Sequence, residues 1–162
     1  AQIDRNQKTI VEFLKAKGFT DDEINISQPQ ITDRQAQLYY ENNNANNQRY
    51  IAEINVLLKT IKIDKVKKTG QEMGELVGKG VTLSSTSIEY MYTKLNDIKP
   101  AMIEEATKEA RKAAEKFAKN SHTMLGGIKY AYQGIFTIEP VHFSTQEQKN
   151  VRVITDVEYF LR

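Results

Sequence analysis

The sequence contains no cysteine and no tryptophan, and it has only two histidines and three prolines among 162 residues. Without cysteine there can be no disulfide, no thiolate metal site and no cysteine nucleophile. No stretch approaches the roughly 20 consecutive apolar residues that a membrane-spanning helix requires. An excess of one charge is also missing, because 23 Lys and Arg residues are set against 21 Asp and Glu residues. This balance argues against a dedicated nucleic-acid-binding protein, which usually concentrates basic residues on one face.

What is present is the composition of an ordinary soluble protein. Hydrophobic residues make up 40% of the chain and charged residues 27%, both typical of globular domains. The length is sufficient for one domain, or one compact pair of half-domains, with a hydrophobic core. The chain begins with Ala1-Gln2 rather than methionine, so we expect that a preceding segment was removed.

Two stretches, residues 4–61 and 101–162, repeat one order of elements: amphipathic helix, glycine stop, strand, polar loop, strand. A helix and a strand over residues 64–93 connect them. The sequence therefore predicts an α+β fold in a single domain, residues 1–162, with helices packed on an antiparallel-rich sheet. The first five elements match a ferredoxin-like unit that lacks its opening strand.

In the first half, the pattern predicts a helix over residues 4–17 that ends at Gly18. Alternating residues from Ile24 predict a strand, in which Pro29 favours an edge or a bulge. Polar residues 41–48 predict a hairpin loop, and residues 50–61 alternate as one long strand.

Residues 64–78 predict a second helix with Asp64 as its N-cap. Three glycines recur there at every fourth position. They predict a weak helix that packs closely on a neighbour, and the charges around them argue against a membrane dimer motif. We expect a strand over residues 81–93, with either a bulge or the true start of the strand within residues 84–87. Pro100 is predicted to open a third helix over residues 101–119. The remaining strands are expected over residues 128–138 and 151–161.

The element order and two local motifs together resemble a known family. The first motif is Gly18-Phe19 followed by an acidic turn. The second is the helix that contains Glu105-Ala106, Ala110-Arg111 and Ala114-Glu115, followed by Leu125-Gly126. With these features the chain resembles the SIMPL-domain family of bacterial envelope proteins over essentially its whole length. The resemblance implies a periplasmic or cell-envelope location, no established catalytic motif, and a role in stress tolerance.

Few residues suggest chemistry. His122 and His142 lie in predicted loops without a companion ligand at metal spacing, so we expect unpaired surface residues. Residues 21–23 are three adjacent acids that cannot all point at one cation, and we expect a solvated turn. No glycine-rich phosphate loop follows a strand. We therefore predict no catalytic, cofactor-binding or metal-binding residue.

Two surface features leave alternatives open. Five lysines between residues 59 and 68 are expected to form a solvated face, with contact to anionic lipid or another polyanion as the alternative. The tyrosines lie mainly on predicted strands. They are expected to pack in the core and on sheet faces, and an exposed tyrosine-rich interaction surface is the alternative. The lysines are Lys59, Lys62, Lys65, Lys67 and Lys68, and the tyrosines include Tyr90, Tyr92, Tyr130, Tyr132 and Tyr159.

Three classes of function fit these observations. The first is a non-enzymatic envelope protein that acts through self-association or partner binding. The second is a small-ligand carrier with a pocket between helices and sheet, and the third is an enzyme of unrecognised type. If the opening strand is missing, the strand over residues 81–93 and the strand over residues 50–61 would expose unpaired backbone groups. We therefore expect a homo-oligomer formed through sheet edges or helix faces, with a monomer as the alternative.

Overall fold

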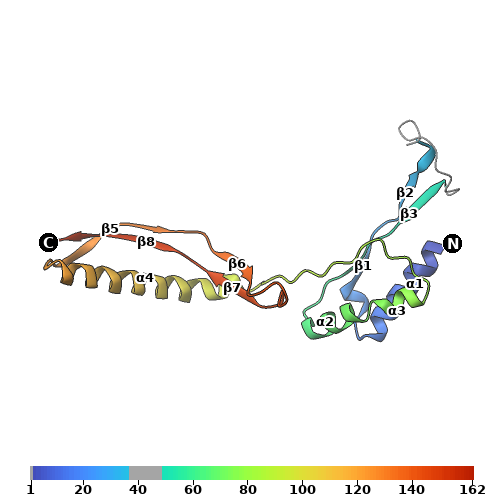
Figure 1. Ribbon diagram of the computed structural model, residues 1–162, viewed down its shortest axis with the longest axis horizontal. Helices are drawn as coiled ribbons and strands as arrows, with labels where there is room; N and C mark the ends of the chain where they lie inside the picture. Colours follow the sequence, from blue (N-terminus) through green and yellow to red (C-terminus); the bar gives the residue numbers. More distant parts are fainter. Residues whose placement is uncertain (1, 37–48) are drawn as a thin grey trace. The chain divides into compact units, whose positions relative to one another are not determined.

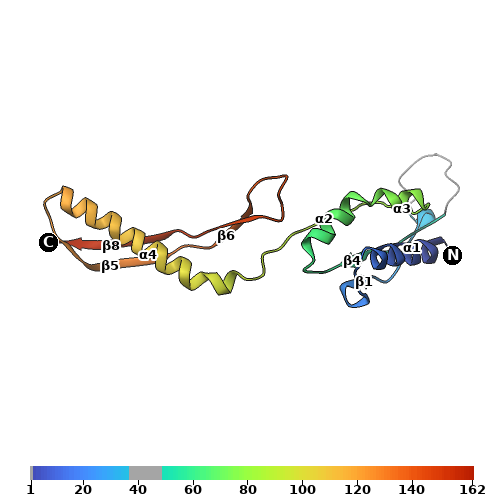
Figure 2. The ribbon, with the colours of Figure 1, turned by 90° about the horizontal axis from the view of Figure 1, so that it is seen from below.

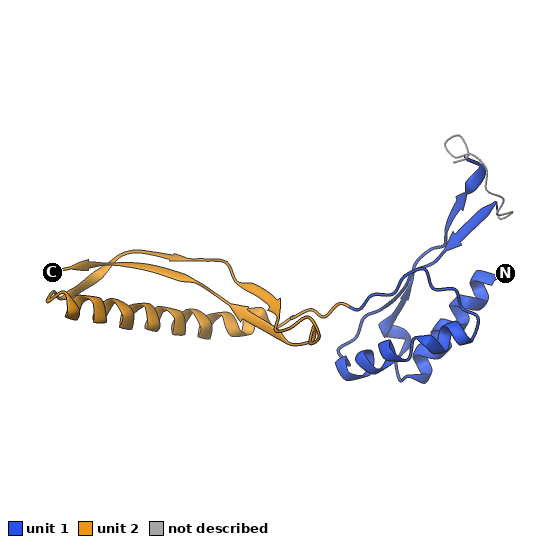
Figure 3. Cartoon of the chain, in the orientation of Figure 1, with its two compact units in different colours: residues 1–88 blue, residues 89–162 orange. Residues whose placement is uncertain are grey.

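The computed structural model describes residues 2–36 and 49–162, which form two compact units, residues 1–88 and 89–162 (Figure 3). Each unit is described by itself. The predicted hairpin loop at residues 41–48 lies outside the described residues. The helices and strands are labelled in Figure 1, and Figure 2 gives a second view.

The first unit contains three α-helices and four short strands among its described residues. Its elements are α1 (Gln2–Ala16), η1 (Asp21–Glu23), β1 (Ile24–Ile26), β2 (Gln30–Asp33), η2 (Arg34–Ala36), β3 (Tyr50–Glu53), β4 (Val56–Leu58), α2 (Ile63–Gln71) and α3 (Gly74–Gly78). The first helix confirms the prediction. Its glycine stop is confirmed too, because Gly18 has a φ of 93°, a left-handed conformation that glycine adopts at low cost.

Both strand pairs of this unit are antiparallel. β1 pairs with β4 and β2 pairs with β3. The predicted long strand over residues 50–61 is therefore divided into β3 and β4. Pro29 falls between β1 and β2, where the missing N–H of proline interrupts no ladder.

The core of this unit lies beneath α1 and α3. Phe13 and Leu14 of α1 pack with Phe19, Leu76 and Val81, and the side chain of Leu76 is completely buried. Half-buried residues from β1, β4 and α2 surround this cluster. These buried apolar side chains therefore hold α1 and α3 against each other.

The predicted helix over residues 64–78 is interrupted. It forms α2 and α3, with Glu72 and Met73 between them, and α2 begins at Ile63, so Asp64 lies in the first turn and is not the N-cap. A Cβ at Gly70 would lie 2.6 Å from Ile88 Cδ1, whereas nothing lies within 4 Å of a Cβ at Gly74 or Gly78. The prediction of close packing is therefore correct for Gly70 and wrong for the other two glycines.

The predicted strand over residues 81–93 is wrong. The structure assigns neither a helix nor a strand to residues 79–94. Val81 and Leu83 pack against the core of the first unit, but residues 82–93 make no backbone hydrogen bond to the described residues. A strand needs a partner, and the described chain offers none beside this segment.

The second unit consists of one long helix on a long two-stranded ribbon (Figure 1). The helix, α4, spans Leu95–Asn120 and confirms helical structure over residues 101–119. It begins earlier than predicted, so Pro100 lies inside the helix instead of opening it. Pro100 is the sixth residue of α4, so the hydrogen bond to the carbonyl of Asn96, four residues earlier, cannot form there.

The ribbon is a bent hairpin with two paired segments. β5 (Leu125–Gln133) pairs with β8 (Thr155–Leu161), and β6 (Thr137–Pro140) pairs with β7 (Lys149–Arg152), both antiparallel. Each of the last two predicted strands is thus divided in two. The α+β class and the antiparallel pairing of the strands are confirmed.

Candidate functional site

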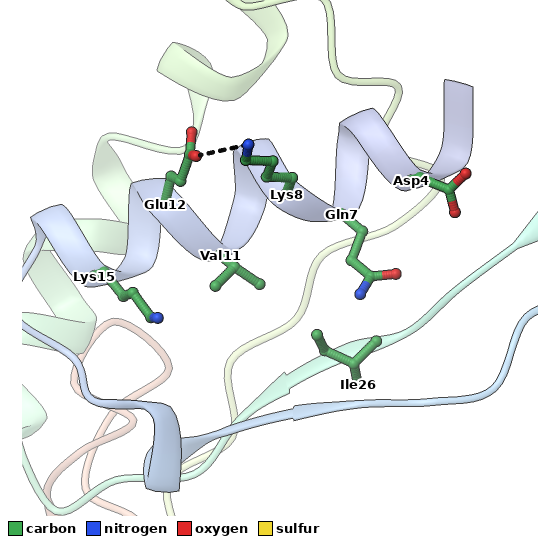
Figure 4. Close-up of a pocket in the computed structure, with 7 residues that line it drawn as sticks. All are labelled: Asp4, Gln7, Lys8, Val11, Glu12, Lys15 and Ile26. Atoms are coloured by element: carbon green, nitrogen blue, oxygen red, sulfur yellow. Dashed lines mark ion pairs between the residues drawn. The ribbon is translucent and has the colours of Figure 1, made fainter. Parts of the chain in front are cut away.

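One groove of the first unit lies between α1 and β1 (Figure 4). Val11 on the helix and Ile26 on the strand provide its apolar surface. The remaining lining residues are polar or charged, and Lys8 and Glu12 face each other with an Nζ–Oε1 distance of 3.9 Å. The groove has a volume of about 410 Å³ and is open to solvent.

A second groove of about 340 Å³ lies beside α3 and is lined by Met73, Val77, Leu83 and residues 84–86. It is also open. A ligand carrier needs an enclosed, largely apolar cavity with a few convergent polar groups. Neither groove has this form, so the carrier hypothesis gains no support from them.

A network of charged groups closes the turn after α1. Glu23 accepts hydrogen bonds from the Lys62 ammonium group at 2.8 Å, from the Thr60 hydroxyl and from the Thr20 backbone N–H at 2.9 Å. Hydrogen bonds from these donors lower the pKa of Glu23 to about 2, and the bond from Lys62 has the largest effect. The Glu23 side chain is only 16% exposed. The prediction of a solvated acidic turn is therefore wrong for Glu23, and Lys62 is bound to a carboxylate rather than part of a free basic face.

A second network joins α1 to the end of α2 and to α3. The Lys17 ammonium group lies 2.6 Å from Glu72 Oε2 and 3.0 Å from Glu75 Oε1. Hydrogen bonding to these two carboxylates raises the pKa of Lys17, and hydrogen bonding to Lys17 lowers the pKa of Glu72. Each charge has a partner of opposite sign, so the network joins the end of α1 to the ends of α2 and α3.

Both histidines have local structural roles. His122 has a φ of 53° just after α4, and its N–H donates to Lys119 O, while Thr123 N–H donates to Ala118 O. This is the pattern of a Schellman cap. His142 Nδ1 lies 2.7 Å from Ser144 Oγ. That contact joins two residues of one turn.

No group of acidic, histidine or cysteine side chains within residues 2–36 and 49–162 is arranged to hold a metal ion. In the same part of the chain, no helix has both the length and the apolar character of a membrane span.

The second unit, residues 89–162, buries little of its apolar surface. All of residues 89–162 are described, and Ala118 is the only one that is buried. Phe117 on α4 is 74% exposed and Phe160 on β8 is 53% exposed. Exposed apolar surface of this kind marks interaction sites when it is contiguous.

The tyrosines divide between the two predicted alternatives. Tyr159 is half-buried on the side of β8 that faces α4. Tyr130 and Tyr132 pair with Glu158 and Asp156 on the opposite face of the ribbon, where both rings are exposed. Side chains directly opposite in an antiparallel pair share one face, so part of the alternative tyrosine-rich surface is present.

Comparison with known families gives one match. Residues 1–152 match the family described as "SIMPL: Protein of unknown function (DUF541)". The chain belongs to the SIMPL family. The match includes residues from both compact units and confirms the resemblance inferred from the sequence. The SIMPL family is one of unknown function and not a known enzyme family. No curated protein matches the chain.

Sequence reasoning missed the ion-pair networks, because Glu23 and Lys62 are 39 positions apart. It missed the cap formed by His122 for a different reason. The end of the helix could be recognised in the sequence, because lysines lie in the last turns of α4 shortly before His122. Glycine or asparagine usually occupies that position, so a histidine there did not suggest a cap.

Proposed function

We propose that this SIMPL-family chain is a non-enzymatic protein that works through self-association, with residues 82–93 providing a strand. One observation carries the proposal. The segment is neither helix nor strand and has alternating apolar residues, yet its backbone N–H and C=O groups have no partner among the described residues. A row of unpaired backbone groups is a template for pairing with another chain.

The side chains of the segment favour a partner over water. Ile88 and Met91 are 48% and 76% exposed, and Ile88, Tyr90 and Tyr92 occupy alternate positions. Alternating apolar residues in an extended segment form one apolar face of a strand. Pairing through the backbone and burial of this face would occur in one step, as they do in β-augmentation.

We propose a periplasmic or cell-envelope location for this association, as the family resemblance implies. A contribution to stress tolerance would then follow from the assembly and not from turnover of a substrate. The support for a non-enzymatic role is the pairing of the charged groups described above and the capping role of His122. Substrate turnover that disappears when His122 or His142 alone is replaced would contradict it.

The experiment is the solution mass, measured by light scattering over a range of concentrations. Wild-type protein is compared with Thr86→Pro and Ser87→Pro, whose N–H groups would point to opposite sides of a strand. Proline fits an extended backbone, and neither N–H is bonded in the single chain. Proline should therefore leave the monomer intact and remove a hydrogen bond from an intermolecular ladder.

We expect a wild-type oligomer and a lower mass for at least one proline variant, with Thr86→Ala and Ser87→Ala behaving as wild type. A wild-type monomer at every concentration would contradict the proposal. Two proline variants with unchanged mass would contradict the role of residues 82–93.

A further inference from the structure

We infer that residues 86–92 of one copy pair along the free edge of β8 in a second copy. This inference rests on the proposed self-association and names the surface that receives the strand. The first support is in the sequence. Residues 86–92 are Thr-Ser-Ile-Glu-Tyr-Met-Tyr, and β8, residues 155–161, is Thr-Asp-Val-Glu-Tyr-Phe-Leu.

The two segments are similar on both faces that a strand would present. Thr, Glu and Tyr recur at the same three positions, and Ile88 and Met91 correspond to Val157 and Phe160. In β8 this pattern belongs to a paired strand with one face toward α4 and one exposed face. Residues 86–92 therefore have the side chains of a ribbon strand without the neighbour that such a strand requires.

The outer edge of β8 is regular and unpaired among the described residues. Gly134 N–H donates to Ile154 O, and Met124 and Arg162 exchange two hydrogen bonds. Ile154 and Arg162 thus direct their backbone groups toward β5. Because these groups alternate in direction along a strand, those of residues 155, 157, 159 and 161 point away from β5. The described strands place no neighbour on that side.

The outer edge of β5 is a poorer acceptor. Its register shifts twice relative to β8, between Leu125 and Ile128 and between Ile128 and Tyr130, and in each case the extra residue lies in β5. Bulges bend a strand and are one of the means by which proteins protect a sheet edge from pairing. The incoming strand should therefore add beside β8.

One side chain near this edge lacks a partner. Thr155 Oγ1 is buried and has no hydrogen-bond partner, although buried hydroxyl groups nearly always have one. An added strand can bring the Thr86 hydroxyl group to the same face, where threonine pairs hydrogen-bond across strands. On α4, Phe117 is exposed, and the small residues Ala106, Ala110 and Ala113 precede it at helical spacing.

The sizes on the two sides are complementary. The small residues of α4 leave space for large ones, and Tyr90 and Tyr92 on alternate positions supply them. From Ala106 to Phe117 the helix rises about 16 Å, which is long enough to lie beside the roughly 13 Å that an extended chain covers from residue 88 to residue 92. Phe117 and Phe160 alone expose about 200–300 Å² of aromatic surface, a substantial part of the roughly 800 Å² per partner in a stable complex.

A second copy is the occupant because Ile88 already lies against Gly70 of α2 in its own first unit, and residues 89–94 lead directly into α4. Pairing with another copy needs no reversal of the chain between Thr93 and Leu95, the first residue of α4. Each copy has one such segment and one such edge. Two copies can therefore exchange strands reciprocally, which closes the assembly.

The absence of cysteine makes a cross-linking test specific. Full-length Ser87→Cys and Asp156→Cys proteins, each with one exposed thiol, are mixed at a concentration where light scattering shows the oligomer, and treated with a short bis-maleimide. We expect a cross-linked heterodimer, recognised by a mass tag on one copy. The matched control replaces Asp156→Cys by Lys129→Cys on β5, one strand further away, and should give at least fivefold less product.

Other results would overturn the inference. Equal products from Asp156→Cys and Lys129→Cys would show that β8 is not the preferred edge. A double variant, Ser87→Cys with Asp156→Cys, that forms only an internal cross-link while the mixture forms none would assign the strand to its own chain. An oligomer without any Ser87–Asp156 product would contradict this pairing and leave the proposed self-association intact, whereas a monomer would contradict both.

Discussion

Glu23 is the residue whose environment differs most from its sequence context. Three adjacent acids predict a solvated turn, and Asp21 and Asp22 are indeed exposed. Glu23 instead accepts hydrogen bonds from Lys62, Thr60 and the Thr20 N–H. The partners Thr60 and Lys62 lie beyond β4, so only the pairing of β1 with β4 brings them close, and local sequence could not reveal this.

The first prediction concerns the pH dependence that Glu23 confers. Its pKa is lowered from 4.5 to about 2 in the folded chain, so the carboxylate stabilises the fold above pH 4.5 and this contribution is lost as the pH falls toward 2. The difference in thermal unfolding midpoint between wild type and Glu23→Gln should be largest at pH 5–7 and should nearly vanish near pH 2. Asp22→Asn, in the same turn, is the control and should show no such loss. A difference that is independent of pH would contradict the assignment.

The second prediction concerns His122, whose positive φ is unusual for a residue with a Cβ. Glycine removes the steric cost of this conformation at the end of α4, so His122→Gly should raise the free energy of unfolding by about 1 kcal/mol. Denaturant titration measures the change. His122→Ala keeps the Cβ and should bring no gain, so equal stabilisation by alanine and glycine would exclude the cap as the cause.

At the scale of elements, the glycines of α2 and α3 show what periodicity can and cannot indicate. Their four-residue spacing correctly predicted a weak helix, since the helix is interrupted at Glu72 and Met73. It did not reveal that only Gly70 faces a close neighbour. Spacing fixes which residues share a face of a helix, but the occupant of that face is decided by tertiary packing.

The third prediction uses this difference. Gly74→Ala adds a methyl group in open space and should stabilise the protein by about 0.5–1 kcal/mol through helix propensity. Gly70→Ala should gain less, because its methyl group would displace Ile88. Both variants are compared by denaturant unfolding. A gain at Gly70 equal to that at Gly74 would mean that residues 82–88 do not pack on α2 as described.

The strands illustrate the same limit. Alternation in the second half correctly placed apolar residues in β5 and β8, because each strand finds its partner within the same hairpin. The same alternation over residues 81–93 predicted a strand that the described chain does not form. An alternating pattern shows that a segment is able to form a strand. Whether it does so depends on a neighbouring strand, which the pattern does not identify.

At the scale of the whole molecule, apolar burial is unevenly distributed. The first unit has a core of five buried apolar residues around Leu76. The second has only Ala118, although its helix and ribbon offer aromatic residues on both faces. Since folding entropy must be offset mainly by burial of apolar surface, the second unit should depend on association for much of its stability.

The fourth prediction follows from that dependence. A partner that binds only the folded state raises stability in proportion to the logarithm of its concentration. The unfolding midpoint of the second unit, followed by near-ultraviolet circular dichroism of its tyrosines, should rise when the protein concentration is increased a hundredfold. Thr86→Pro or Ser87→Pro should weaken this rise. A midpoint that does not depend on concentration would contradict coupling between folding and association.

The proposed association requires that residues 86–92 find backbone partners in another copy. Amide hydrogen exchange, measured residue by residue on the full chain at low and high concentration, tests this most directly. We expect rapid exchange of these amides in dilute protein, since none is bonded within the described chain. In the oligomer, alternate amides of the segment should be protected together with those of residues 155, 157 and 159 on the outer edge of β8. Rapid exchange of residues 86–92 in a sample that light scattering shows to be oligomeric would contradict it.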